Sequence, residues 1–194
     1  FVTLLSLLAG YAMSRYRFRG KGFVYVLMLV TQMLPAVFLM IPLFQTMVNL
    51  HLINNLWSLV LICTCTNLPF CMFMMMGYYN SVPNELEEAA QVDGCTLLGA
   101  VFRILIPVML PSIVATGAYA FINAWNVYVY ATAFITDRTK YTLPLALNVF
   151  QGEYGTDYGL LAAGCVIALL PVIIIFAFIQ KHLSGGATSG AVKG

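Results

Sequence analysis

The sequence predicts an all-α protein that crosses a membrane several times. Hydrophobic residues make up 61% of its 194 residues and charged residues only 8%, a balance far from that of soluble domains. Apolar runs long enough to cross a bilayer recur along the chain between short polar links. Because no linker divides the chain, we expect a single transmembrane domain over residues 1–194 with about five membrane helices.

The first apolar run, residues 1–16, is rather short for a crossing, which needs about 20 residues. It begins without methionine. We therefore expect it to be the end of a helix whose start is missing, and we expect any earlier helix to be missing as well. Its basic residues follow the run, which argues against a signal peptide. These are Arg15, Arg17, Arg19 and Lys21, and such a cluster beside apolar helices favours the cytoplasmic side over a nucleic-acid site.

The next two runs, residues 23–48 and 56–79, are each long enough to cross. Two prolines lie in the first of them, and membrane helices tolerate proline where neighbours satisfy the freed carbonyls. The second is rich in cysteine and methionine, which raises copper transport as an alternative. Cys63 and Cys65 would point about 200° apart on a helix, so adaptable packing is the better explanation.

A polar island at residues 81–107 holds four of the seven carboxylates of the chain. We expect two short helices here. Ser81 can cap the first, whose opening glutamates suit the helix dipole, and Gly94 can adopt the left-handed backbone that ends it. Thr96 can cap the second, which is apolar. Such a compact knob at the membrane surface is suited to docking on a partner.

The fourth run, residues 107–134, carries polar and aromatic side chains at helical spacing. Polar groups are costly against lipid, so this stripe should face the bundle or a water-filled path. Rings beside neutral amides suit a sugar, while hydrogen bonding between helices is the alternative. The stripe comprises Ser112, Thr116 and four candidate substrate-path residues, Tyr119, Asn123, Asn126 and Tyr130.

Residues 136–159 form a mixed loop, and residues 160–179 form a last run that can cross. Five runs that alternate from an outer N-terminus put seven basic residues inside and two outside, as the positive-inside rule requires. We therefore expect the C-terminus in the cytoplasm. The inner residues are Arg15, Arg17, Arg19, Lys21, Arg103, Lys181 and Lys193, and the outer ones are Arg138 and Lys140.

The sequence lacks the residue patterns that several classes of protein require. There is no G-x-x-x-x-G-K-[ST] loop, so the chain should not bind ATP by itself. The cysteines show no zinc spacing, and no serine, histidine and aspartate stand together in a motif. No carboxylate lies within a spanning run, which weighs against a proton-coupled carrier. We expect a transport subunit, not an enzyme, with no cofactor or metal of its own.

The polar island has the order E-L-x-E-A-A-x-x-D-G, then an apolar stretch ending in I-L-I-P and a second proline at Pro111. This order resembles the EAA loop of membrane subunits of bacterial ABC importers; Cys95, where the family often has alanine, is a small departure. In the family this loop is the coupling helix, which sits in a groove of the ATP-hydrolysing subunit. The resemblance implies that the following residues make that contact: Glu85, Glu88, Ala89, Ala90, Asp93 and Gly94.

The sequence NAWNVYVYATAFITD and the tail GGATSGAVKG are similar to the carbohydrate branch of this family, the maltose-type permeases. The resemblance covers Tyr11 to Gly194 and implies a type I importer permease fold in the bacterial inner membrane that moves a sugar or oligosaccharide inward. It also implies a related second permease, two subunits that use ATP and Mg, and an extracytoplasmic sugar-binding protein. The alternatives are a polyol or glycerol derivative as solute, a secondary transporter, and a structural or sensory subunit.

Overall fold

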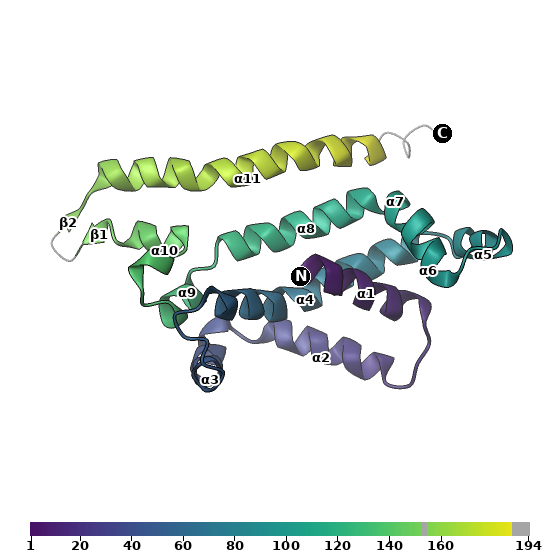
Figure 1. Ribbon diagram of the computed structural model, residues 1–194, viewed down its shortest axis with the longest axis horizontal. Helices are drawn as coiled ribbons and strands as arrows, with labels where there is room; N and C mark the ends of the chain where they lie inside the picture. Colours follow the sequence, from purple (N-terminus) through teal and green to yellow (C-terminus); the bar gives the residue numbers. More distant parts are fainter. Residues whose placement is uncertain (153–154, 188–194) are drawn as a thin grey trace.

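The computed structural model describes residues 1–152 and 155–187. The long helices pack side by side along one direction (Figure 1), and the expected all-α membrane fold is confirmed. α8 lies between α11 and α4, while α1 and α2 pack on α4 from the other side. These long helices are α1 (Val2–Arg15), α2 (Lys21–Met33), α4 (Leu56–Ser81), α8 (Leu110–Trp125) and α11 (Tyr158–Ala187).

Two helices of the described chain are by themselves long and apolar enough to cross a membrane, α4 and the Tyr158–Gln180 part of α11. Two further pairs of helices pass the same test together, but each pair is bent, by 103° and by 77°. Counted by length and composition, the described residues therefore offer two to four spans, where the sequence predicts about five. α1 has 14 residues, which agrees with the expectation that the first run is short.

The expected span over residues 23–48 is wrong as a single helix. α2 ends at Met33, and α3 (Ala36–Asn49) begins after Pro35. Proline disfavours helical backbone in the residue before it, and Leu34 is accordingly extended, with φ −81° and ψ 120°. The second proline of this run lies inside α3 and does not divide it.

The expected span over residues 107–134 is also divided. α8 ends at Trp125, and α9 (Val129–Phe134) follows a short non-helical link. Before α8, the chain turns through a π-helical segment, η1 (Val101–Leu105), and the short α7 (Ile106–Val108). Interrupted backbone at membrane depth is tolerated where it is buried in protein or lines a cavity. We therefore expect the link between α8 and α9 to be buried or to line a cavity.

α1 approaches α4 closely because a glycine faces it. A Cβ atom on Gly10 would lie 2.7 Å from the Met75 Cβ and 3.0 Å from the Met76 nitrogen. Small residues allow this kind of close packing between membrane helices. The absence of a side chain at Gly10 therefore allows α1 and α4 to pack closely.

We expect Gly10→Ala to lower the free energy of unfolding by about 1–3 kcal/mol, the usual cost of overpacking a tight contact. Gly77→Ala in α4 is the matched control, because a Cβ there would meet nothing within 4 Å. Thermal unfolding of both variants in detergent, followed by circular dichroism, measures the difference. Equal melting temperatures would contradict the close α1–α4 contact.

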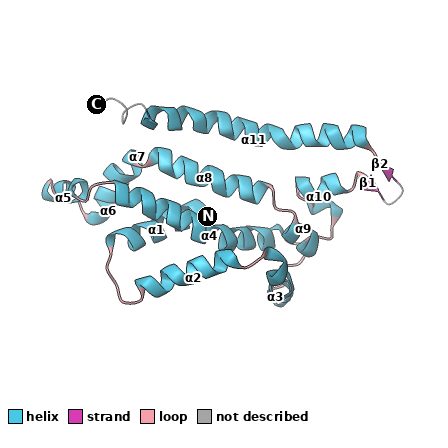
Figure 2. Cartoon of the chain, turned by 180° about the vertical axis from the view of Figure 1, so that it is seen from behind, coloured by secondary structure: helices cyan, strands magenta, loops and turns pink. Residues whose placement is uncertain are grey.

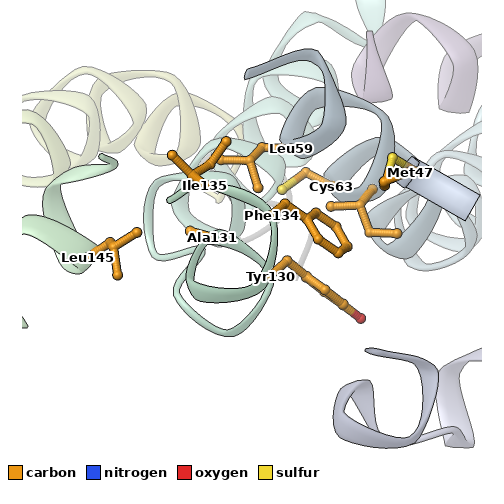
Figure 3. Packing of buried hydrophobic residues seen from close by; sticks show 9 residues of the cluster. Met47, Leu59, Cys63, Tyr130, Ala131, Phe134, Ile135 and Leu145 are labelled. Atoms are coloured by element: carbon orange, nitrogen blue, oxygen red, sulfur yellow. The ribbon is translucent and has the colours of Figure 1, made fainter. Parts of the chain in front are cut away.

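Two clusters of buried apolar side chains hold the two ends of the bundle. At one end, side chains of α3, α4 and α9 gather around Phe134, as Figure 3 shows. At the other, Leu7, Met75, Tyr79 and Leu105 pack together. The end around Phe134 also carries the remaining short elements, η2 (Arg138–Lys140), α10 (Leu143–Asn148) and a hairpin of β1 (Gln151–Gly152) with β2 (Gly155–Thr156).

Asn54, in the link between α3 and α4, connects this link to the loop that follows α9. It takes a left-handed backbone, with φ +58°. Its Oδ1 accepts hydrogen bonds from the Thr136 nitrogen at 2.6 Å and the Asp137 nitrogen at 3.0 Å. The Lys140 Nζ donates to the Asn54 carbonyl at 2.9 Å. The α3–α4 link and the loop after α9 therefore form one surface.

The opposite end carries the α1–α2 loop, α5 (Glu85–Val92), α6 (Leu97–Ala100) and α7, and Figure 2 shows this separation from behind. Arg15, Arg17, Arg19, Lys21 and Arg103 belong to elements of this end, whereas Arg138 and Lys140 belong to the hairpin end. The described chain therefore has the charge asymmetry that the sequence predicts. The tail from residue 188 on, with Lys193, lies outside the described residues.

Candidate functional site

The first candidate site is residues 81–107, the coupling loop of the family resemblance. It contains α5 (Glu85–Val92) and α6 (Leu97–Ala100), separated by a glycine turn. Gly94 has φ +88°. The Cys95 nitrogen donates to the Ala90 carbonyl at 2.9 Å, and the Gly94 nitrogen donates to the Gln91 carbonyl at 3.0 Å. This is the Schellman pattern of helix ends, so the predicted glycine stop is confirmed.

The Thr96 cap is confirmed as well, because its Oγ1 accepts from the Gly99 nitrogen at 3.1 Å. The expected Ser81 cap is wrong. Ser81 is the last residue of α4, and its hydroxyl donates to the Tyr78 carbonyl at 2.7 Å. Val82 precedes a proline and is extended, with ψ 123°, so α5 cannot begin until after this link.

The predicted ATPase-contact residues divide into two faces of α5 and its turn. Five are exposed: Glu85, Glu88, Ala89, Asp93 and Gly94. Ala90 is buried, where its small side chain lets α5 lie against the rest of the loop. The exposed set thus combines three carboxylates with two small residues, Ala89 and Gly94.

Glu87 is the residue of this site that the sequence reasoning missed. It is only 6% exposed and pairs with Arg15, with the Arg15 Nε 2.5 Å from the Glu87 Oε1. The available signal was its spacing: Glu87 precedes Ala90 by three positions and therefore shares its face of the helix. Glu85 and Glu88 fall on the exposed faces instead.

The second candidate site is an open cavity of about 520 Å³ between α2, α3, α4, α8 and α9. Both helix breaks open onto it, since Leu34 and Ala36 flank one break and Asn126 to Tyr128 form the other. None of the described residues that line it is charged. Its polar lining consists of Thr31, Gln32, Cys63, Cys65, Thr66, Asn67, Tyr119, Asn123, Asn126, Tyr128 and Tyr130.

The four predicted substrate-path residues all line this cavity, although they do not lie on one straight helix. Asn126 follows the end of α8, and Tyr130 belongs to α9. The Asn123 Nδ2 donates to the Tyr119 carbonyl at 2.9 Å. The Tyr119 ring lies 4.5 Å from that of Phe70, centroid to centroid. The structure therefore places an amide, two phenols and a second amide around one space.

The first two residues of the predicted stripe, Ser112 and Thr116, are not among those that line the cavity. Thr116 is completely buried, and its hydroxyl donates to the Ser112 carbonyl at 2.9 Å and reaches the Met75 Sδ at 3.4 Å. This is contact between packed helices. The stripe thus serves bundle packing at one end of α8 and lines the cavity at the other.

Two observations bear on the copper-transport alternative. Cys63 is buried and Cys65 is exposed, and both belong to the lining of the cavity. Among the described residues, no group of three or more histidine, cysteine, aspartate or glutamate side chains could hold a metal ion.

Residues 3–188 match the protein family described as "Binding-protein-dependent transport system inner membrane component". The chain belongs to this family. It is therefore a membrane-located component of a binding-protein-dependent transport system, and the permease resemblance is confirmed. The match takes in both the coupling loop and the cavity.

Permeases of sugar transport systems are among its relatives. The chain is 34% identical to the sulfoquinovosyl glycerol transport system permease protein SmoH of Agrobacterium fabrum, over 98% of this chain and 67% of that protein. It is 36% identical to the arabinooligosaccharides transport system permease protein AraQ of Halalkalibacterium halodurans, over 98% of this chain and 68% of that protein. The chain thus spans about two thirds of the length of these relatives.

A solved structure has the same fold. A chain from the crystal structure of a bacterial ABC transporter involved in the import of the acidic polysaccharide alginate superimposes with a TM-score of 0.74, at 24% identity. The match covers 93% of this permease and 71% of that chain. The importer permease fold is confirmed.

Proposed function

We propose that this permease is a transmembrane subunit of an ATP-driven importer that moves a sugar or oligosaccharide inward across the bacterial inner membrane. The observation that carries the proposal is the uncharged cavity onto which two broken helices open. Discontinuous helices supply binding groups in the middle of many transporters. Phenol rings and neutral amides offer a sugar apolar faces and hydrogen-bond partners without the cost of burying charge.

ATP hydrolysis belongs to partner subunits, which use ATP and Mg, and it reaches this chain through the coupling loop. The exposed face of Glu85, Glu88, Ala89, Asp93 and Gly94 sits in a groove of an ATPase. If that face binds one ATPase state better than another, the difference in affinity shifts the permease between its conformations. The chain itself contributes no ATP site.

The complete importer contains two such ATPases, a related but non-identical second permease that shares the path, and a sugar-binding protein that docks at the hairpin end. The C-terminus lies on the cytoplasmic side with the coupling loop. The basic residues at the coupling-loop end support this orientation.

A glycerol derivative is the second candidate substrate, because one relative bears the name of a sulfoquinovosyl glycerol system. Such a solute also presents neutral hydroxyl groups. Its sulfonate, however, would be a charge in a cavity whose described lining is uncharged, so we favour a neutral sugar.

Purification from native membranes in mild detergent tests the proposal. Every co-purifying chain is identified, and ATP hydrolysis is measured with the binding protein and a panel of maltose, trehalose, diacetylchitobiose, an arabino-oligosaccharide and sulfoquinovosyl glycerol. We expect two ATPase copies, a related permease, and stimulation of hydrolysis by one neutral sugar. Purification without an ATPase, together with uptake driven by an ion gradient, would overturn the proposal.

A further inference from the structure

The buried carboxylate of α5 makes contact with two side chains of α1. The Glu87 Oε1 accepts from the Arg15 Nε at 2.5 Å, and its Oε2 accepts from the Tyr11 hydroxyl at 2.8 Å. The Arg15 and Glu87 side chains are 12% and 8% exposed. Both carboxylate oxygens are therefore used, and both bonds run to the same helix.

Arg15 also contacts the end of α4. Its Nη2 donates to the Val82 carbonyl at 3.0 Å, at the link between α4 and α5. The hydroxyl of Ser14, the residue before Arg15, donates to the Asn80 Oδ1 at 2.6 Å. The last turn of α1 thus holds the last turn of α4 and the first turn of α5 together.

α5 has eight residues, and a helix this short is not stable in isolation. Its position depends on what it is attached to. A buried ion pair is a poor way to gain stability, because desolvation cancels much of the attraction, and apolar residues of similar size often serve equally well. What directional hydrogen bonds to both carboxylate oxygens provide is a defined position of one element on another.

We propose that Glu87 is a positioning residue that makes α5 and α1 move as one unit, so that displacement of the coupling loop by the ATPase is passed directly to α1. This inference rests on the proposed function. In this arrangement the exposed face of α5 binds the ATPase, while the buried face delivers the movement. The tight α1–α4 packing at Gly10 then carries the movement into the bundle.

Hydrogen–deuterium exchange of the assembled importer, with Mg·ATP or with ADP, tests this inference without any need for the transported sugar. In the wild type, the two nucleotides should give different protection in both α5 and α1. In Glu87→Gln, the difference should persist in α5 and fall in α1 by at least about fivefold, the lower end of typical coupling between sites. Only complexes that retain the ATPase subunits are compared.

Arg15→Gln should have the same effect, and the double variant should be no worse than either single variant, because residues that act as a pair are not additive. Arg17→Gln, an exposed neighbour, is the matched control and should behave as the wild type. A full α1 response in Glu87→Gln, or additive losses in the double variant, would overturn the positioning role alone. If protection of α5 in the wild type is the same with Mg·ATP and with ADP, the proposed coupling itself is wrong. The positioning role is then wrong as well.

Discussion

Replacing Gly94 by glutamate is expected to lower sugar uptake at least about tenfold, within the usual range of coupling between sites, while the subunit still inserts in the membrane. Gly94 has φ +88°, a conformation that costs other residues about 1–2 kcal/mol. A Cβ there would meet nothing within 4 Å. The chain itself therefore leaves room for the side chain, and the added carboxylate would project toward the ATPase from the turn that ends α5.

Uptake and ATP hydrolysis in proteoliposomes measure this effect, and two further variants identify its cause. Gly94→Asn keeps the charge neutral, and asparagine tolerates left-handed backbone, so it should lose much less uptake. Gly20→Glu places the same charge at a glycine with φ +93° and open space, but in the α1–α2 loop. Normal uptake by Gly94→Glu, or an equal loss in Gly20→Glu, would contradict the docking role of this turn.

Asn123→Leu is expected to lower the uptake rate at low sugar concentration by about tenfold, and basal ATP hydrolysis should not change. Leucine has a similar size but cannot bond a hydroxyl, and a polar group left unpaired costs about 1–3 kcal/mol. At about 1.4 kcal/mol per factor of ten, that loss corresponds to a range from several-fold to more than a hundredfold. Asn123 lines the cavity beside Tyr119, so the loss should fall on substrate contact.

Initial uptake rates over a range of sugar concentrations measure the effect of Asn123→Leu. Asn49→Leu is the matched control, because Asn49 is exposed at the end of α3 and is not among the residues that line the cavity. Wild-type kinetics for Asn123→Leu would mean that Asn123 serves only its bond to the Tyr119 carbonyl. An equal loss in Asn49→Leu would mean that the effect does not arise in the cavity.

The sequence by itself determined the features that depend on neighbouring residues. Composition and run length predict the membrane fold and the helices α4 and α11, since burial of apolar surface follows directly from residue type. Gly94 ends α5 and Thr96 caps α6 as expected, because backbone preference and capping act within a few positions. The order of charges along the chain predicts which end carries the basic residues.

Only the tertiary structure decided which distant residues meet. Glu87 and Arg15 are 72 positions apart, and no local pattern specifies that the last turn of α1 reaches α5. The two prolines of residues 23–48 give similar local signals, yet Pro35 separates two helices and Pro42 lies within one. Whether a proline breaks a helix depends on the packing around it, and it is this packing that opens both helix breaks onto one cavity.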